Sequence, residues 1–356
     1  MKRGAWVYAL LLLLASACAA APTASPHATG TPVRVCTPVT PKDANASEPY
    51  KTIIEPFDLV APSGNRIYGL IRRPDPALYR DLCFPAVVLV PGGINPGRLL
   101  AMGQDARALA EAGMVVITFN AEGRVDKSPE DIASEGSEDY NGFRHQDGLC
   151  ALVAYAAKLA YVMPDNIGLA TQSYGITMGA GCAGRHPEIP IRYIVDGEGP
   201  PNSFVTCHEP AALDKDPAND KHELIRGILG HYSTSRDPSP SNLAFWSERE
   251  AINFIGKFRG KYLRLQATWD HAQPPSSDAE RTAFNLPPTW WHNKHTMDIV
   301  NAAVAGGVPW VRVNLAEQRN PINATYTMER PPVYLPGKLA DKPWSVRAIL
   351  EMAGIR

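Results

Sequence analysis

Several motifs of cofactor, metal and nucleic-acid chemistry are missing from this chain of 356 residues. It has no Walker-type phosphate loop, no C-x-x-C pair and no H-E-x-x-H run, so we expect neither a cofactor nor a metal ion. Its 35 basic and 36 acidic residues give a formal net charge of −1, and they form no Lys/Arg block. That balance argues against a nucleic-acid partner. The length allows one large α/β domain.

The N-terminus has the pattern of a signal peptide. Lys2 and Arg3 precede an apolar run at residues 5–14, which is short for a membrane span and is followed by small residues. The ending A-S-A-C resembles a bacterial lipobox, with alanine where leucine is usual. We therefore predict that residues 1–17 are a signal peptide and that Cys18 carries a lipid, which makes the protein a cell-envelope lipoprotein at a membrane surface. Cleavage without lipidation, giving a secreted or periplasmic protein, is the alternative.

A tract rich in Pro, Ala, Thr and Ser follows at residues 18–48 and predicts a disordered tether to a domain at residues 49–356. Five cysteines remain after Cys18. Cys36 and Cys83 are a candidate disulfide that ties the N-terminal arm to the domain. None of the five lies in a nucleophile or metal motif, so each is predicted to be buried or bridged.

Strand and helix patterns alternate along the predicted domain. Two early strands flank a turn signal at residues 63–65. Further strands, mostly continuous apolar runs, are predicted at residues 85–93, 114–120, 191–197, 261–269 and 308–316. Helices are predicted at residues 99–112 and about 147–160. This order favours a mostly parallel central sheet flanked by helices, with a site at the carboxyl ends of the strands. A polar, Pro-rich insertion at about residues 200–255 is predicted to cap that site.

The run NIGLATQSYGITMGAG at residues 166–181 predicts a strand, a one-residue pivot and a helix. Ser173 stands at the pivot, and glycines from Gly175 onward keep the start of the helix slim, so that strand and helix can pack closely. The match is T-x-S-x-G, with Thr171 in place of the leading glycine of the nucleophile elbow G-x-S-x-G. In that elbow a strained turn projects the serine hydroxyl above a sheet. A serine that caps an ordinary helix is the alternative.

Residues 52–316 resemble an α/β-hydrolase, nearer the dienelactone-hydrolase and prolyl-oligopeptidase-like branch than the lipases. The resemblance rests on VLVPGG, the loop NAEGR…SEGSEDYNG…QDG, the elbow TQSYG and the segment WDHAQP. It implies acyl transfer to water through a covalent intermediate on Ser173. It also implies an oxyanion hole made by the N–H groups of Gly93 and Tyr174, and Asp270 as the acid that orients the base.

The histidine that this family places after its last strand is missing. No histidine follows His295, and the expected loop reads EQRNPINATY. His271, beside the predicted acid, and His295, at the start of a predicted helix, are the two candidate bases, with His292 behind them. Neither candidate is preferred over the other on the sequence.

The acid also has alternatives. Adjacent residues of an extended segment point to opposite sides, so Asp270 is poorly placed to orient His271. Asp196 and Glu198 end the strand predicted at residues 191–197, and a pairing of Glu198 with His271 is therefore a second arrangement.

We predict an exported serine hydrolase that cleaves a carboxylic ester, with a small-molecule ester as its substrate. A serine peptidase or amidase that acts on a short peptide keeps the chemistry and changes the substrate. The missing late histidine motivates a third hypothesis, a non-catalytic binding protein on a hydrolase scaffold.

Overall fold

The computed structural model describes most of the predicted domain. The described residues are 36–39, 48–201, 245, 247–269, 290–315, 323–327, 329–339 and 343–355, with no side chains for 290–295. The predictions for the leader, Cys18, Asp270, His271 and most of the insertion lie outside them. Within these ranges, no helix combines the length and the apolar character needed to cross a membrane.

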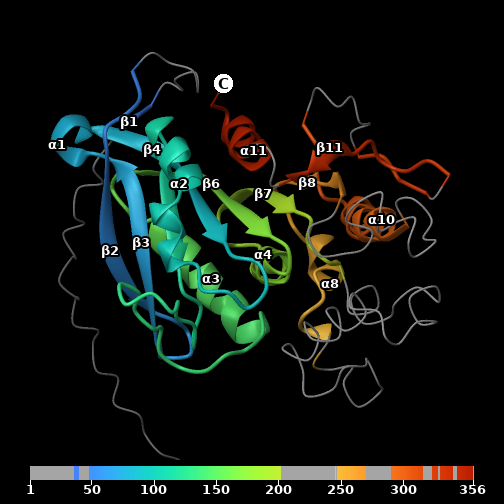
Figure 1. Cartoon of the computed structure of the whole chain (residues 1–356), viewed down its shortest axis with the longest axis horizontal. Helices are drawn as coiled ribbons and strands as arrows, with labels where there is room; N and C mark the ends of the chain where they lie inside the picture. Colours follow the sequence, from blue (N-terminus) through green and yellow to red (C-terminus); the bar gives the residue numbers. More distant parts are fainter. Residues whose placement is uncertain are drawn as a thin grey trace, which may run out of the picture. The chain divides into compact units, whose positions relative to one another are not determined.

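In the described part of the chain, nine strands form one sheet in the order β10-β8-β7-β6-β4-β5-β3-β2, with β1 paired to β4. Figure 1 shows β2 and β3 in blue at one edge, and β7 and β8 in yellow to orange farther across. Strands β2 and β3, and β3 and β5, pair antiparallel, whereas the other pairs are parallel. The bounds are β1 Thr37–Pro38, β2 Thr52–Val60, β3 Arg66–Pro74, β4 Leu82–Val90, β5 Val115–Phe119, β6 Val162–Gln172, β7 Ile191–Gly197, β8 Lys261–Leu265 and β10 Trp310–Val313.

Helices cover both faces of this sheet, because alternate residues of its central strands point to opposite sides. On β4, Val88 belongs to the apolar cluster with α3, α4, α8 and α10, whereas its neighbour Val87 belongs to the cluster with α2 and α11. The helices are α1 Pro76–Tyr79, a 3₁₀ turn at Arg98–Met102, α2 Gln104–Glu111, α3 Phe143–Ala156, α4 Gly175–Arg185, α8 Ile252–Ile255, α10 Trp290–Ala305 and α11 Trp344–Ala353. The predicted three-layer α/β arrangement, with a mostly parallel sheet, is confirmed.

Three predicted elements differ from the structure. The helix expected from residue 147 begins at Phe143, and the helix expected from residue 99 begins as a 3₁₀ turn. The strand expected at residues 261–269 breaks at Gln266 into β8 and β9, which spans Ala267–Trp269. The break has a physical cause. The Gln266 N–H donates to Asn314 Oδ1 (3.0 Å), and its carbonyl accepts from Leu335 N (3.0 Å), which starts β11 (Leu335–Lys338). The chain therefore leaves the main sheet and pairs with β11 in a second, two-stranded sheet.

Two disulfides join described elements. Cys36–Cys83 ties the arm that carries β1 to β4, as predicted. Cys150–Cys182 joins α3 to α4, two neighbouring helices on one face of the sheet. Since Cys182 lies on the helix that follows Ser173, this second bridge fixes the elbow helix to its neighbour.

Candidate active site

Ser173 occupies the junction between β6 and α4. Strand β6 ends at Gln172, α4 begins at Gly175, and Ser173 has a φ of +49°. A positive φ is uncommon for a residue other than glycine, and such strain persists only where the surroundings hold it. The Ser173 N–H donates to the carbonyl of Gly197 (2.8 Å), so the junction is bound to the end of β7. The predicted strand–pivot–helix geometry is therefore present.

Two glycines let the end of β4 pack against this junction. A Cβ on Gly175 would lie 2.5 Å from the carbonyl oxygen of Pro91, closer than real Cβ contacts. A Cβ on Gly92 would lie 3.1 Å from the Ser173 Cβ. A side chain does not fit at Gly175, and one at Gly92 would push its neighbours apart, so the P-G-G turn after β4 and the serine turn form one compact unit.

The two predicted oxyanion residues are held by one side chain. Gly93 has a φ of +61°, and Tyr174 is buried at the start of α4. The amide nitrogen of Asn141 donates to the carbonyl of Gly93 (3.1 Å) and to the carbonyl of Tyr174 (3.0 Å). The fold thus brings Gly93 and Tyr174 together within the span of a single amide group.

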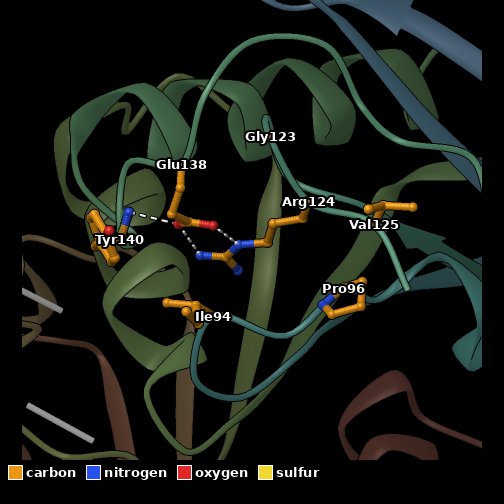
Figure 2. Close-up of a pocket in the computed structure, with 7 residues that line it drawn as sticks. All are labelled: Ile94, Pro96, Gly123, Arg124, Val125, Glu138 and Tyr140. Carbon is orange, nitrogen blue, oxygen red and sulfur yellow. Dashed lines mark hydrogen bonds and ion pairs between the residues drawn. The ribbon is translucent and has the colours of Figure 1, made fainter. Parts of the chain in front are cut away.

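A polar cluster in the loop after β5 supports Asn141. Arg124 donates two hydrogen bonds to Glu138 (2.8 Å each) and one to Asn141 Oδ1 (2.7 Å). Figure 2 shows the paired Arg124 and Glu138, with the backbone nitrogen of Tyr140 also donating to Glu138. Burial acts to raise the pKa of the Glu138 carboxyl, but the hydrogen bonds and charge of Arg124 outweigh it and lower that pKa. Glu138 is therefore an ionised partner.

His145 belongs to the same cluster and is not available as a base. Its Nε2 lies 3.0 Å from the carbonyl of Glu122, so this nitrogen carries the proton, and its Nδ1 accepts from the Asn141 N–H (3.3 Å). Burial first, and then the charge of Arg124, lower the pKa of His145 to about 4. It is a neutral structural imidazole with both nitrogens engaged.

A pocket of about 420 Å³ opens beside this cluster. Its lining combines the turn after β4 with the loop after β5, as Figure 2 shows, and consists of Ile94, Pro96, Gly123, Arg124, Val125, Glu138 and Tyr140. Ile94 directly follows Gly93, and Tyr140 directly precedes Asn141. The pocket therefore adjoins Gly93 and the Asn141 that donates to it.

On the opposite side of Ser173, the two acidic residues at the end of β7, Asp196 within the strand and Glu198 after it, have different environments. Asp196 is fully buried and accepts hydrogen bonds from Arg264 (2.8 Å) and from the hydroxyl of Tyr262 (2.7 Å). These contacts make it part of the core between β7 and β8 rather than an acid for catalysis. Glu198 is also buried, has a φ of +54° and accepts from the Ala267 N–H (3.1 Å) at the break between β8 and β9.

Asn314 directly follows β10, and the loop in which the resemblance placed the histidine comes after it along the chain. Its side-chain amide accepts from the Gln266 N–H and donates to the carbonyl of Val333. The end of β10 is thereby tied to the end of β8 and to the segment before β11. The Thr296 hydroxyl donates to Gln266 Oε1 (3.2 Å), so this turn of α10 is fixed to the end of β8. His295 immediately precedes Thr296 in α10, whereas Asp270 and His271 lie outside the described residues.

No protein-family model matches the sequence, and no curated protein matches it either. Solved structures do. Puromycin hydrolase matches over 86% of this chain and 40% of its own, with 13% identity and a TM-score of 0.56. Dipeptidyl peptidase 4 of Porphyromonas gingivalis matches over 73% of this chain and 31% of its own, with 16% identity and a TM-score of 0.50. Brefeldin A esterase, a bacterial homologue of human hormone sensitive lipase, matches over 86% of this chain and 77% of its own, with 13% identity and a TM-score of 0.52.

This chain has the α/β-hydrolase fold. It spans less than half the length of the first two of these structures, and at such identities the likeness establishes the fold alone. The residues of this site that the sequence did not predict are those that support the turn beside Ser173, namely Arg124, Glu138, Asn141 and His145. Their concentration in the loop NAEGR…SEDYNG and just after it was a possible indication of a polar cluster, but the loop was used only as a motif of the family resemblance.

Proposed function

We propose that this protein is an exported serine hydrolase that cleaves carboxylic esters through a covalent acyl intermediate on Ser173. The observation that carries the proposal is the left-handed conformation of Ser173 at the junction of β6 and α4, with glycines packed on both sides. Strain of this kind gathers at functional sites, and it is the local geometry of a nucleophile elbow.

In the proposed reaction, Ser173 Oγ bonds to the ester carbonyl carbon while its proton passes to a base. The carbonyl oxygen becomes an oxyanion, which the N–H groups of Gly93 and Tyr174 stabilise. The C–O bond to the alcohol then breaks, and the base returns the proton to the departing alcohol. Water repeats the sequence on the acyl-serine and releases the carboxylic acid.

The base in this proposal is His295 or His271. The anchoring of Thr296 to Gln266 supports His295, because it fixes that part of α10 at the end of β8, two strands from Ser173. Asp270 is the proposed orienting acid, and buried Glu198 is its alternative.

The pocket beside Gly93 supports a small ester as the substrate. Its volume of about 420 Å³ is near the lower end for ligand sites, and its lining combines the apolar Ile94, Pro96 and Val125 with the Arg124–Glu138 pair. An acyl group of a few carbons fits such a space beside Gly93, against the apolar residues. We place the acyl group there and the alcohol on the opposite side of Ser173.

Export and lipid anchoring at Cys18 remain proposals from the leader sequence. The two disulfides support export, since bridges of this kind persist in oxidising compartments. Expression in a bacterial host with labelled palmitate tests the anchor. We expect the label in the membrane fraction of wild type and its loss in Cys18→Ser, whereas an unlabelled, soluble wild-type protein would indicate simple secretion.

Labelling with a fluorophosphonate probe tests the chemistry. We expect one adduct, on Ser173, and turnover of p-nitrophenyl acetate that Ser173→Ala abolishes. Ser128→Ala, which removes a hydroxyl of the loop after β5 that the mechanism does not use, should keep both. A folded wild-type protein that neither labels nor turns over ester would refute the proposal and favour a binding protein.

The same assay separates the candidate bases and substrates. Loss of turnover in His295→Ala or in His271→Ala, with the other variant active, identifies the base. Ester turnover that greatly exceeds cleavage of a matched aryl amide supports the esterase proposal, and the reverse supports the peptidase.

A further inference from the structure

We propose that Asn141 is the positioning residue of the oxyanion hole: its amide sets the geometry of Gly93 and Tyr174 together. The inference rests on the proposed function, and it assigns a role to a side chain that does not itself touch substrate. The observation behind it is the pair of hydrogen bonds from Asn141 Nδ2 to the carbonyls of Gly93 (3.1 Å) and Tyr174 (3.0 Å).

The orientation of this amide is fixed by its neighbours. Arg124 donates to Asn141 Oδ1 (2.7 Å), and a guanidinium can only donate, so the oxygen must face Arg124. The amide nitrogen then faces the two carbonyls. Arg124 is in turn held by its two hydrogen bonds to Glu138, which leave it one orientation.

The backbone of Asn141 is held as firmly as its side chain. Tyr140 and Asn141 have φ values of +51° and +62°, and Asn141 is fully buried. The Asn141 N–H donates to His145, and its carbonyl accepts from the side chain of Gln146 (3.0 Å). Two successive left-handed residues persist only where the surroundings determine them, as these contacts do.

The consequence for catalysis follows from how an oxyanion hole works. Its donors stabilise charge only if they already point at the position that the oxyanion will occupy. Gly93 lies on the turn after β4 and Tyr174 on the turn after β6, so their relative position depends on a link between the two turns. Asn141 supplies that link by donating to the carbonyls of both residues.

The test compares Asn141→Ala with Asn166→Ala. Asn166 is also buried, and its amide nitrogen also donates to a carbonyl, that of Ala353 (3.0 Å), but it lies seven positions before Ser173 on β6. We expect Asn141→Ala to lower kcat for p-nitrophenyl acetate by about 10- to 100-fold with little change in KM, since misplaced donors cost rate rather than ground-state binding. Asn166→Ala should leave kcat within about twofold.

A second readout separates positioning from general destabilisation. Phenylboronic acid forms a tetrahedral adduct with a serine, so its Ki should rise by a factor similar to the loss in kcat, whereas binding of the product acetate should stay unchanged. Asn141→Ser, whose hydroxyl is too short to reach both carbonyls, gives the same test if the alanine variant does not fold.

The failures are distinguishable. A wild-type protein without fluorophosphonate labelling or turnover would overturn the proposed function and this inference with it. A reactive wild type whose folded Asn141 variants keep wild-type kcat and phenylboronic acid affinity would overturn the inference alone.

Discussion

The buried neutral His145 predicts a specific loss of stability in acid. Burial and the charge of Arg124 lower its pKa from 6.5 to about 4 in the folded protein. In the unfolded chain the same imidazole takes up a proton near pH 6.5. The unfolded state therefore binds more protons between pH 6.5 and 4, and folding stability falls as the pH falls through that window.

The magnitude follows from the two pKa values. Each pKa unit corresponds to about 1.4 kcal/mol, so the full difference is worth about 3 kcal/mol below pH 4 and about 2 kcal/mol at pH 5. Because the side chain has no exposed surface, solvent screening reduces this little. His145→Gln removes the titration and keeps a donor for the carbonyl of Glu122.

Urea unfolding of both proteins at pH 7.5, 6.5, 5.5 and 5.0 is the assay. We expect wild type to be the more stable protein at pH 7.5, and its advantage over His145→Gln to shrink by about 2 kcal/mol at pH 5. An advantage that stays constant across the series would refute the assignment of His145 as a buried neutral group.

Three further predictions test the packing around the site. Gly175→Ala places a Cβ against the carbonyl oxygen of Pro91, so we expect about a 100-fold loss of kcat for p-nitrophenyl acetate, whereas Gly148→Ala, in helix α3, meets only the tip of one side chain and should be neutral in the same assay. Cys150→Ala opens a disulfide that closes a loop of 32 residues and should lower the free energy of unfolding by about 2 to 4 kcal/mol, measured in urea. Arg264→Met leaves a buried carboxylate without its cation and should cost about 3 to 5 kcal/mol, seen as a large fall in Tm.

The fold was predictable because its central strands are buried on both faces. Strands β4 and β5 appear as nearly continuous apolar runs, and those runs differ from ordinary amphipathic patterns. The elbow was predictable for a similar reason, since small residues on both sides of Ser173 record a close approach of backbones. These features depend on residues near each other in sequence.

The missed features depend on partners that are distant in sequence. Helix α3 begins four residues before the predicted start. The sequence did not indicate this because its first turn contains the polar residues His145 and Gln146, which are buried against partners in other segments. The break at Gln266 depends on Asn314 and Leu335, which are distant in sequence. No local pattern encodes such contacts, so the sequence indicated a loop in one place and an unbroken strand in the other.

The two sides of Ser173 differ in how they are built, and that difference bears on the base. On the side of Gly93, a polar cluster centred on Asn141 holds the turns after β4 and β6 in one arrangement. On the other side, Asn314 directly follows β10, and both ends of its amide bond neighbouring backbone. Asn314 therefore ties strands together, and the loop expected to carry the base, residues 317–326, contains no histidine. The base of the proposed hydrolase must come from another segment, and the turn of α10 that contains His295 is a described element anchored at the end of β8.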